Sequence, residues 1–227
     1  MSDLLKKIHS RGYWHVIIRP ATFEEKRIPN ISHLYPIVER CAVQLRGWDY
    51  PHVDTRTQPV IEKDWVGEEF DWEQFLEIWR LYQSGQFIHV FGMVEDWLDQ
   101  STLPTSHHWE AAEALAFGNA LLQFTEVFEF AARLAVTEAG DQTMHIEITV
   151  HGLRGRTLVN DFRSGFPFRA HRADLDTLPY SIDIPQADLI ANPRELALEP
   201  ASELFRRFGK DVSQETLRAL QQRSFLT

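Results

Sequence analysis

Residues 117–158, FGNALLQFTEVFEFAARLAVTEAGDQTMHIEITVHGLRGRTL, decide the fold class predicted for this chain. From Phe117 to Ala135, apolar side chains recur at helical spacing and leave only a narrow polar stripe, which indicates an amphipathic helix that is largely buried. Gly140 is a typical residue for ending such a helix. Residues 143–151 then alternate between apolar and polar side chains, which predicts a strand with one buried face.

The residues after this strand predict a β-hairpin. Residues 152–155, GLRG, are typical of a turn, and residues 156–159 are expected to return as the second strand. A buried helix followed by a half-buried hairpin favours an α+β fold. C-terminal helices are expected as well, because Asn192 and Pro193 are typical of a helix N-terminus and Ser213 is a suitable cap for a last helix.

The N-terminal half predicts the element order β-α-β-β-α-β, which is the order of a ferredoxin-like unit. We expect one helix from Ser32 to about Arg40, and a second one that begins at Asp71, because Asp71 and Gln74 have the spacing of a capping box. Gly67 is expected to end the third strand. The four predicted strands are residues 13–19, 43–48, 60–66 and 87–93.

Composition narrows the class of protein. Hydrophobic residues make up 44% of the chain and charged residues 25%, which is ordinary for a globular protein, and the formal net charge of -10 disfavours general nucleic-acid binding. A single cysteine, Cys41, excludes an internal disulfide and argues against a cysteine-based zinc site. Residues 1–12 lack the apolar core of a signal peptide, and no apolar run approaches the roughly 18 residues of a membrane helix, so we expect a cytoplasmic protein with no membrane partner.

The tryptophans are distributed unevenly. All seven lie between Trp14 and Trp109, and the second half is aromatic only through phenylalanine and tyrosine. Together with the loop from Gln100 to His108, this shift predicts a joint near residue 105. We expect residues 1–105 to form a Trp-rich α+β unit and residues 106–227 a helix–hairpin–helical unit, packed together as one globule.

The arginine-rich segment, residues 154–172, is the most suggestive candidate for a binding surface. It has five arginines against one acidic residue, Asp161, and phenylalanines lie among them. Arginine forks bind phosphates and carboxylates, and aromatic rings can stack on bases. The alternative is a solvated surface with its phenylalanines in the core. The predicted ligand- or partner-binding residues are Arg154, Arg156, Arg163, Arg169 and Arg172.

Acidic and histidine side chains supply weaker candidates. Asp49, His52 and Asp54 lie in one short loop and can hold a divalent metal or form an acid–base pair, but such residues also make ordinary turn hydrogen bonds. His145, Glu147 and His151 share one strand face, which is otherwise a normal solvated face. The acid-rich residues 62–77 are interpreted as a helix N-terminus and solvated surface, with acid–base chemistry or cation binding as the alternative.

Part of the second half resembles a known group of proteins. Residues 128–134 (FEFAARL), 146–150 (IEITV) and 153–158 (LRGRTL) are similar to a region of uncharacterised bacterial proteins that often carry a Schlafen-type AlbA-like domain. That domain is presumed to bind nucleic acid or ATP, and it does not appear in this chain. The resemblance implies a bacterial accessory or regulatory module.

Three hypotheses follow. The first is a non-enzymatic bacterial interaction or regulatory module that self-associates and binds a protein partner, an anionic ligand or a nucleotide through the arginine-rich segment. The second is a metal-dependent hydrolase or nuclease that uses Asp, His and Glu residues, although the common nucleotide-binding and hydrolase signatures are absent from the sequence. The third is a small-ligand sensor with its pocket between the Trp-rich half and the central helix. The sequence identifies no cofactor.

Overall fold

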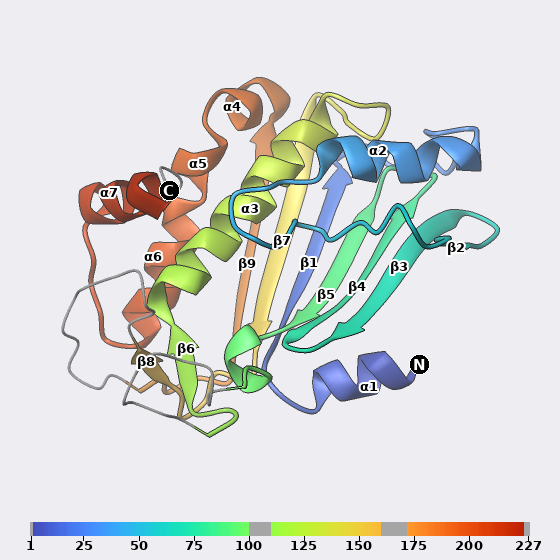
Figure 1. Cartoon of the computed structure of the whole chain (residues 1–227). Helices are drawn as coiled ribbons and strands as arrows, with labels where there is room; N and C mark the ends of the chain where they lie inside the picture. The colour runs from blue at the N-terminus through green and yellow to red at the C-terminus, as the bar shows by residue number, and fades with distance from the viewer. Residues whose placement is uncertain (1, 100–109, 160–171, 225–227) are drawn as a thin grey trace.

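The computed structural model describes residues 2–99, 110–159 and 172–224, and its centre is a seven-stranded antiparallel sheet (Figure 1). The strands follow the order β2-β3-β4-β5-β1-β7-β9 across this sheet. The predicted α+β class is therefore confirmed. The strands of the sheet are β1 (Tyr13–Pro20), β2 (Val60–Ile61), β3 (Trp65–Trp72), β4 (Phe75–Tyr82), β5 (Phe87–Gly92), β7 (Thr143–His151) and β9 (Thr177–Pro185).

Helices cover the sheet on the face turned to the viewer in Figure 1, where α2 and α3 cross the strands and α4 to α7 lie beside α3. On the other face, α1 packs Ile8 against Leu76 and Ile78. Among the described residues, no helix has the length and hydropathy needed to cross a bilayer. The helices are α1 (Asp3–His9), α2 (Leu34–Cys41), α3 (Phe117–Ala135), α4 (Gln186–Ala191), α5 (Pro193–Leu196), α6 (Leu198–Arg207) and α7 (Gln214–Ser224), with short 3₁₀ turns η1 (Ile31–His33) and η2 (Val94–Asp96).

The predicted central helix is confirmed as α3, and its apolar face forms the middle of the core. Phe124 packs edge-on against Trp14 of β1 with ring centroids 5.0 Å apart, and Phe130 lies 4.5 Å from Phe87 of β5. Burial of each such aromatic side chain contributes roughly 1.5–3 kcal/mol. These contacts hold α3 across the sheet and fix which of its side chains face the strands.

The sheet joins the two halves of the chain. β1 pairs with β5 on one side and with β7 on the other, so strands from before and after residue 105 share one sheet and one hydrophobic core. The predicted joint itself, near residue 105, lies outside the described residues.

The predicted hairpin between residues 143–151 and 156–159 is wrong. The first segment is β7, but it pairs with β1 and β9, whereas β8 (Thr157–Val159) pairs in parallel with β6 (Ala114–Ala116) in a separate two-stranded sheet. Gly152 and Gly155 have φ angles of +71° and +78°, and they turn the chain away from β7. The long β9 can cover the whole length of β7, which three residues of β8 cannot.

The predicted helix beginning at Asp71 and the predicted strand at residues 43–48 are also wrong. Residues 75–82 form β4, and β3 continues through Gly67 to Trp72. β4 lies between two strands, and most of its side chains are buried on one face or the other, so its apolar residues match a helical spacing without forming a helix. Val43 makes only an isolated bridge to Tyr50. Apart from the 3₁₀ turns, the element order of this half is therefore α1-β1-α2-β2-β3-β4-β5.

The turn between β3 and β4 gives a test of this correction. Glu73 has a φ of +51°, a left-handed conformation that costs a residue with a Cβ about 1–2 kcal/mol. We expect Glu73→Gly to stabilise the protein by about 0.5–1 kcal/mol in urea unfolding, because glycine adopts positive φ freely. Glu73→Ala keeps the Cβ and is the control, with no gain expected. Destabilisation by Gly and stabilisation by Ala would instead indicate a helix.

Candidate functional site

A pocket of about 370 Å³ lies between strands β4 and β5, helix α3 and residues 42–59, which we call the pocket loop. We call this cavity the α3 pocket. Its volume lies in the range of about 300–1,000 Å³ that is common for small-molecule sites. Four aromatic side chains line it, namely Trp48, Tyr50, Phe75 and Phe91.

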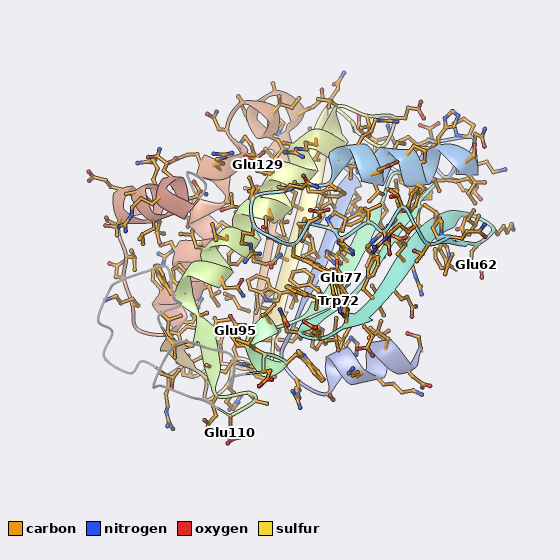
Figure 2. All side chains as sticks on the ribbon, in the orientation of Figure 1. Glu62, Trp72, Glu77, Glu95, Glu110 and Glu129 are labelled. Carbon is orange, nitrogen blue, oxygen red and sulfur yellow. The ribbon has the colours of Figure 1, made fainter. Side chains whose placement is uncertain are left out.

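A buried glutamate–histidine pair forms one side of the α3 pocket. Glu77 Oε2 lies 2.8 Å from His89 Nε2, and the same carboxylate accepts hydrogen bonds from Trp48 Nε1 at 2.6 Å and from the His52 backbone N–H at 3.2 Å. Burial alone raises the pKa of Glu77, but the hydrogen bonds from His89, Trp48 and the His52 backbone outweigh burial and lower that pKa. Glu77 and Trp72 lie close together near the centre of Figure 2, where both contact Trp48.

Two polar atoms beside this pair are buried without a hydrogen-bond partner among the described residues. They are His89 Nδ1 and Tyr50 Oη. His89 is 2% exposed and Tyr50 3%, and their ring centroids are 5.0 Å apart. Burial raises the pKa of Tyr50 well above its ordinary value, so its hydroxyl stays neutral. A buried polar group left unpaired costs about 1–3 kcal/mol, so a hydrogen-bond partner for either atom would stabilise the protein.

The opposite side of the α3 pocket is a polar stripe on α3. Arg46 of the pocket loop reaches this stripe, with Nε 2.7 Å from Glu126 Oε1 and Nη2 3.0 Å from Gln123 Oε1, and it also donates to Asn119. Asn119, Gln123 and Glu126 are spaced four and three residues apart, which places them on one helix face. The Glu126 side chain is 1% exposed. The pocket loop is thereby attached to α3.

A second buried carboxylate attaches the pocket loop to the sheet. Glu68 of β3 accepts hydrogen bonds from the Asp54 backbone N–H at 3.3 Å, from Thr57 Oγ1 at 3.4 Å and from Tyr35 Oη at 3.3 Å. Burial raises the pKa of Glu68 to about 7, although these hydrogen bonds act in the opposite direction. Glu68 and Glu77 therefore hold one loop with oppositely shifted pKa values.

The residues predicted as metal ligands have other contacts. The His52 ring stacks on Trp48 with centroids 3.8 Å apart, Asp54 pairs with Arg56 at 2.8 Å, and Asp49 lines the α3 pocket. In the part of the chain that the structure describes, no group of three or more His, Cys, Asp or Glu side chains is arranged to hold a metal ion. Asp49, His52 and Asp54 are therefore neighbours in sequence but do not converge.

The second histidine set is also divided among different partners. His145 pairs with Asp183 at 2.7 Å, whereas His151 stacks on Tyr13 with centroids 4.3 Å apart. Glu147 lies between them along β7, and all three side chains are partly exposed. The interpretation as a half-exposed polar strand face fits this arrangement.

The structure divides the predicted arginine surface. Arg154 and Arg172 are exposed, and Arg163 and Arg169 lie outside the described residues. Arg156 is fully buried, and its inclusion in a binding surface is therefore corrected. Its guanidinium donates to Asp96 at 2.7 and 2.5 Å, and both side chains of this ion pair are 0% exposed.

The Asp96 carboxylate explains why Arg156 is inside the protein. It also accepts the backbone N–H groups of Gly12 at 2.9 Å and Ala112 at 2.8 Å, so it joins three distant segments. A buried carboxylate with this role requires a buried cation. Arg156 provides that cation in place of a contact with a ligand.

The sequence predicts candidate acidic sets that contain two residues of the α3 pocket, Asp49 and Glu77, but it does not predict that they share a site with His89 or Arg46. The sequence predicts a helix at Glu77 and an apolar strand at His89, and neither prediction brings the two side chains together as β4 and β5 do. A histidine inside the otherwise apolar residues 87–93, and amide and acid side chains at helical spacing in residues 119–126, are the signals that the sequence contains. The sequence does not show which residues contact this histidine or these polar side chains, because those contacts form only in the folded chain.

The chain has no match among protein-family models, curated proteins or solved structures.

The corrected role of Arg156 predicts a large effect on stability. Arg156→Ala leaves Asp96 as an uncompensated buried charge, and we expect a loss of about 3–5 kcal/mol in urea or thermal unfolding. Arg154→Ala is the matched control, with an expected change within about 0.5 kcal/mol because that side chain is exposed. Equal, small effects for both variants would contradict the buried ion pair.

Glu68 predicts a pH dependence of stability. Its folded-state pKa of about 7 lies above the unfolded value of about 4.3, so the folded state binds more protons in this window and loses stability as pH rises through it. We expect wild type to lose this stability between pH 4 and pH 8, whereas Glu68→Gln has no such carboxyl group to titrate. The unfolding free energy of the variant minus that of wild type is therefore expected to rise from pH 4 to pH 8. Glu69→Gln, at the exposed neighbouring position, is the control. A difference for Glu68→Gln that does not change with pH would contradict the raised pKa.

Proposed function

We propose that this chain is a non-enzymatic regulatory or interaction module that binds a small organic ligand in the α3 pocket. The observation that carries this proposal is that Tyr50 and His89, whose Oη and Nδ1 atoms are buried without a partner, both line a cavity of ligand size. Sites of this kind combine an apolar lining with a few fixed polar groups. The position of the pocket between the Trp-rich half and α3 supports the small-ligand hypothesis from the sequence.

The polar groups of the α3 pocket are fixed in advance. Glu77 orients His89, and Arg46 is held by the stripe on α3. Groups that are already ordered lose little entropy when a ligand binds, which favours affinity. The metal-dependent hydrolase hypothesis has less support, because Asp49, His52 and Asp54 do not converge.

A second proposal keeps the interaction surface at the exposed arginines. The backbone N–H of Gly155 donates to the Ala173 carbonyl at 3.1 Å, and Thr157 bridges to Arg172, so the segments that carry Arg154 and Arg172 lie side by side. Two exposed guanidinium groups on adjacent segments suit a carboxylate or phosphate of a partner protein, an anionic ligand or a second copy of this chain. A bacterial origin and a cytoplasmic location remain part of this proposal.

Ligand binding is tested by thermal shift and tryptophan fluorescence against a panel of amines, amino acids, nucleobases, nucleosides and sugars. A ligand that binds only the folded state raises the melting temperature, and Trp48 on the pocket lining is expected to report it. We expect Tyr50→Phe to weaken binding by about 3–10-fold, because it removes one hydrogen bond worth about 0.5–1.5 kcal/mol.

The control for this experiment is Tyr82→Phe, which removes a hydroxyl from β4 at a position that does not line the α3 pocket. Binding that changes equally in both variants would place the ligand elsewhere. The absence of any stabilising compound from the panel would contradict the proposed function.

A further inference from the structure

We infer that the ligand of the α3 pocket is a small organic cation of the amidinium, guanidinium or alkylammonium class. This inference rests on the proposed function and names its ligand class. The first supporting observation is charge: the lining contains the carboxylates of Asp49, Glu77 and Glu126 but only one guanidinium, that of Arg46. The excess of negative charge favours a cation and disfavours an anion, and the partial exclusion of water strengthens both effects.

The second observation is the aromatic lining. Tyr50, Phe75 and Phe91 line the pocket beside Trp48, and the Trp48 ring is stacked between His52 at 3.8 Å and Phe75 at 4.1 Å. Aromatic faces attract organic cations, and the attraction is stronger when the cation is shielded from water. This stacking covers the faces of the Trp48 ring, so the aromatic groups of the lining that remain for a cation are Tyr50, Phe75 and Phe91.

The third observation is that the pocket already binds one guanidinium. Arg46 places its planar fork against Asn119, Gln123 and Glu126 of α3, with acceptors at 2.7 and 3.0 Å and further hydrogen bonds to Asn119 and Glu126. The acceptors of this stripe therefore match the geometry of a planar nitrogen cation.

The fourth observation is the unpartnered histidine nitrogen. His89 Nε2 lies 2.8 Å from the Glu77 carboxylate, which only accepts, so the ring donates from Nε2, and in the tautomer with that single proton Nδ1 is an acceptor. The Tyr50 hydroxyl can accept a second hydrogen bond beside it. Two neighbouring acceptors suit the N–H groups of an amidinium or a guanidinium.

Three compounds of nearly equal shape separate charge from shape. They are benzamidinium, benzamide and benzoate, which are a cation, a neutral amide and an anion on the same ring. We expect benzamidinium to bind the full chain at least tenfold more tightly than benzamide, by thermal shift and tryptophan fluorescence at constant ionic strength, and benzoate to bind most weakly. Asp49→Asn is expected to weaken benzamidinium binding several-fold and to leave benzamide binding unchanged.

A charge change in the opposite direction completes the test. Arg46→Gln removes the cation of the pocket lining, so we expect benzamidinium to bind several-fold more tightly if the variant remains folded by circular dichroism. Glu129→Gln is the control for Asp49→Asn, because Glu129 pairs with Arg194 and does not line the pocket (Figure 2). It is expected to change the affinity for neither compound.

The outcomes separate this inference from the proposed function. If benzamide or benzoate bound as tightly as benzamidinium, and that binding were weakened by Tyr50→Phe, the pocket would be a ligand site but the cation class would be wrong. If none of the three bound, the cation class would also be wrong, and the wider panel of compounds would decide the proposed function. Benzamidinium binding that Asp49→Asn and Glu129→Gln weakened equally would overturn the inference as well.

Discussion

The α3 pocket depends on a carboxylate buried in the middle of a strand. An ionised carboxylate that leaves water loses several kcal/mol of solvation, which only close partners recover. Glu77 obtains these partners from the neighbouring strand through His89 and from the pocket loop through Trp48 and the His52 backbone. The same three contacts orient the histidine, fix the indole and close one side of the cavity. The partners that the buried Glu77 carboxylate requires therefore also order the side chains of the α3 pocket.

The same constraint operates at two other places in the chain. Glu126 is nearly inaccessible on α3 and is paired with Arg46, and Asp96 is paired with Arg156 in an ion pair that water does not reach. The Asp96 pair is surrounded by backbone donors and stabilises the fold, whereas the Arg46 pair lies at the edge of a cavity and forms part of its lining. The two pairs therefore differ in their surroundings: the fold encloses one of them, and the other borders a cavity.

The sequence predicted the elements in which the spacing of apolar side chains fits only a helix or only a strand. Residues 117–135 form the central helix and residues 143–151 the alternating strand, because each has a single buried face. Prediction failed at β4, where burial on both faces made a strand resemble a helix, and at β8, where two left-handed glycines redirect the chain. The candidate site could not be predicted, because Glu77, His89 and Arg46 become neighbours only through strand pairing and the path of the pocket loop. Arg156 was misplaced for the same reason, since the acid that draws it inside is 60 residues away in sequence.

The most direct test of this account is the tautomer of His89, measured from the two ring ¹⁵N chemical shifts in the folded protein. We predict a proton on Nε2, where the imidazole meets Glu77, and an unprotonated Nδ1 whose shift changes when a ligand occupies the α3 pocket. A proton on Nδ1 with a bare Nε2, or an Nδ1 shift that no pocket ligand changes, would contradict it.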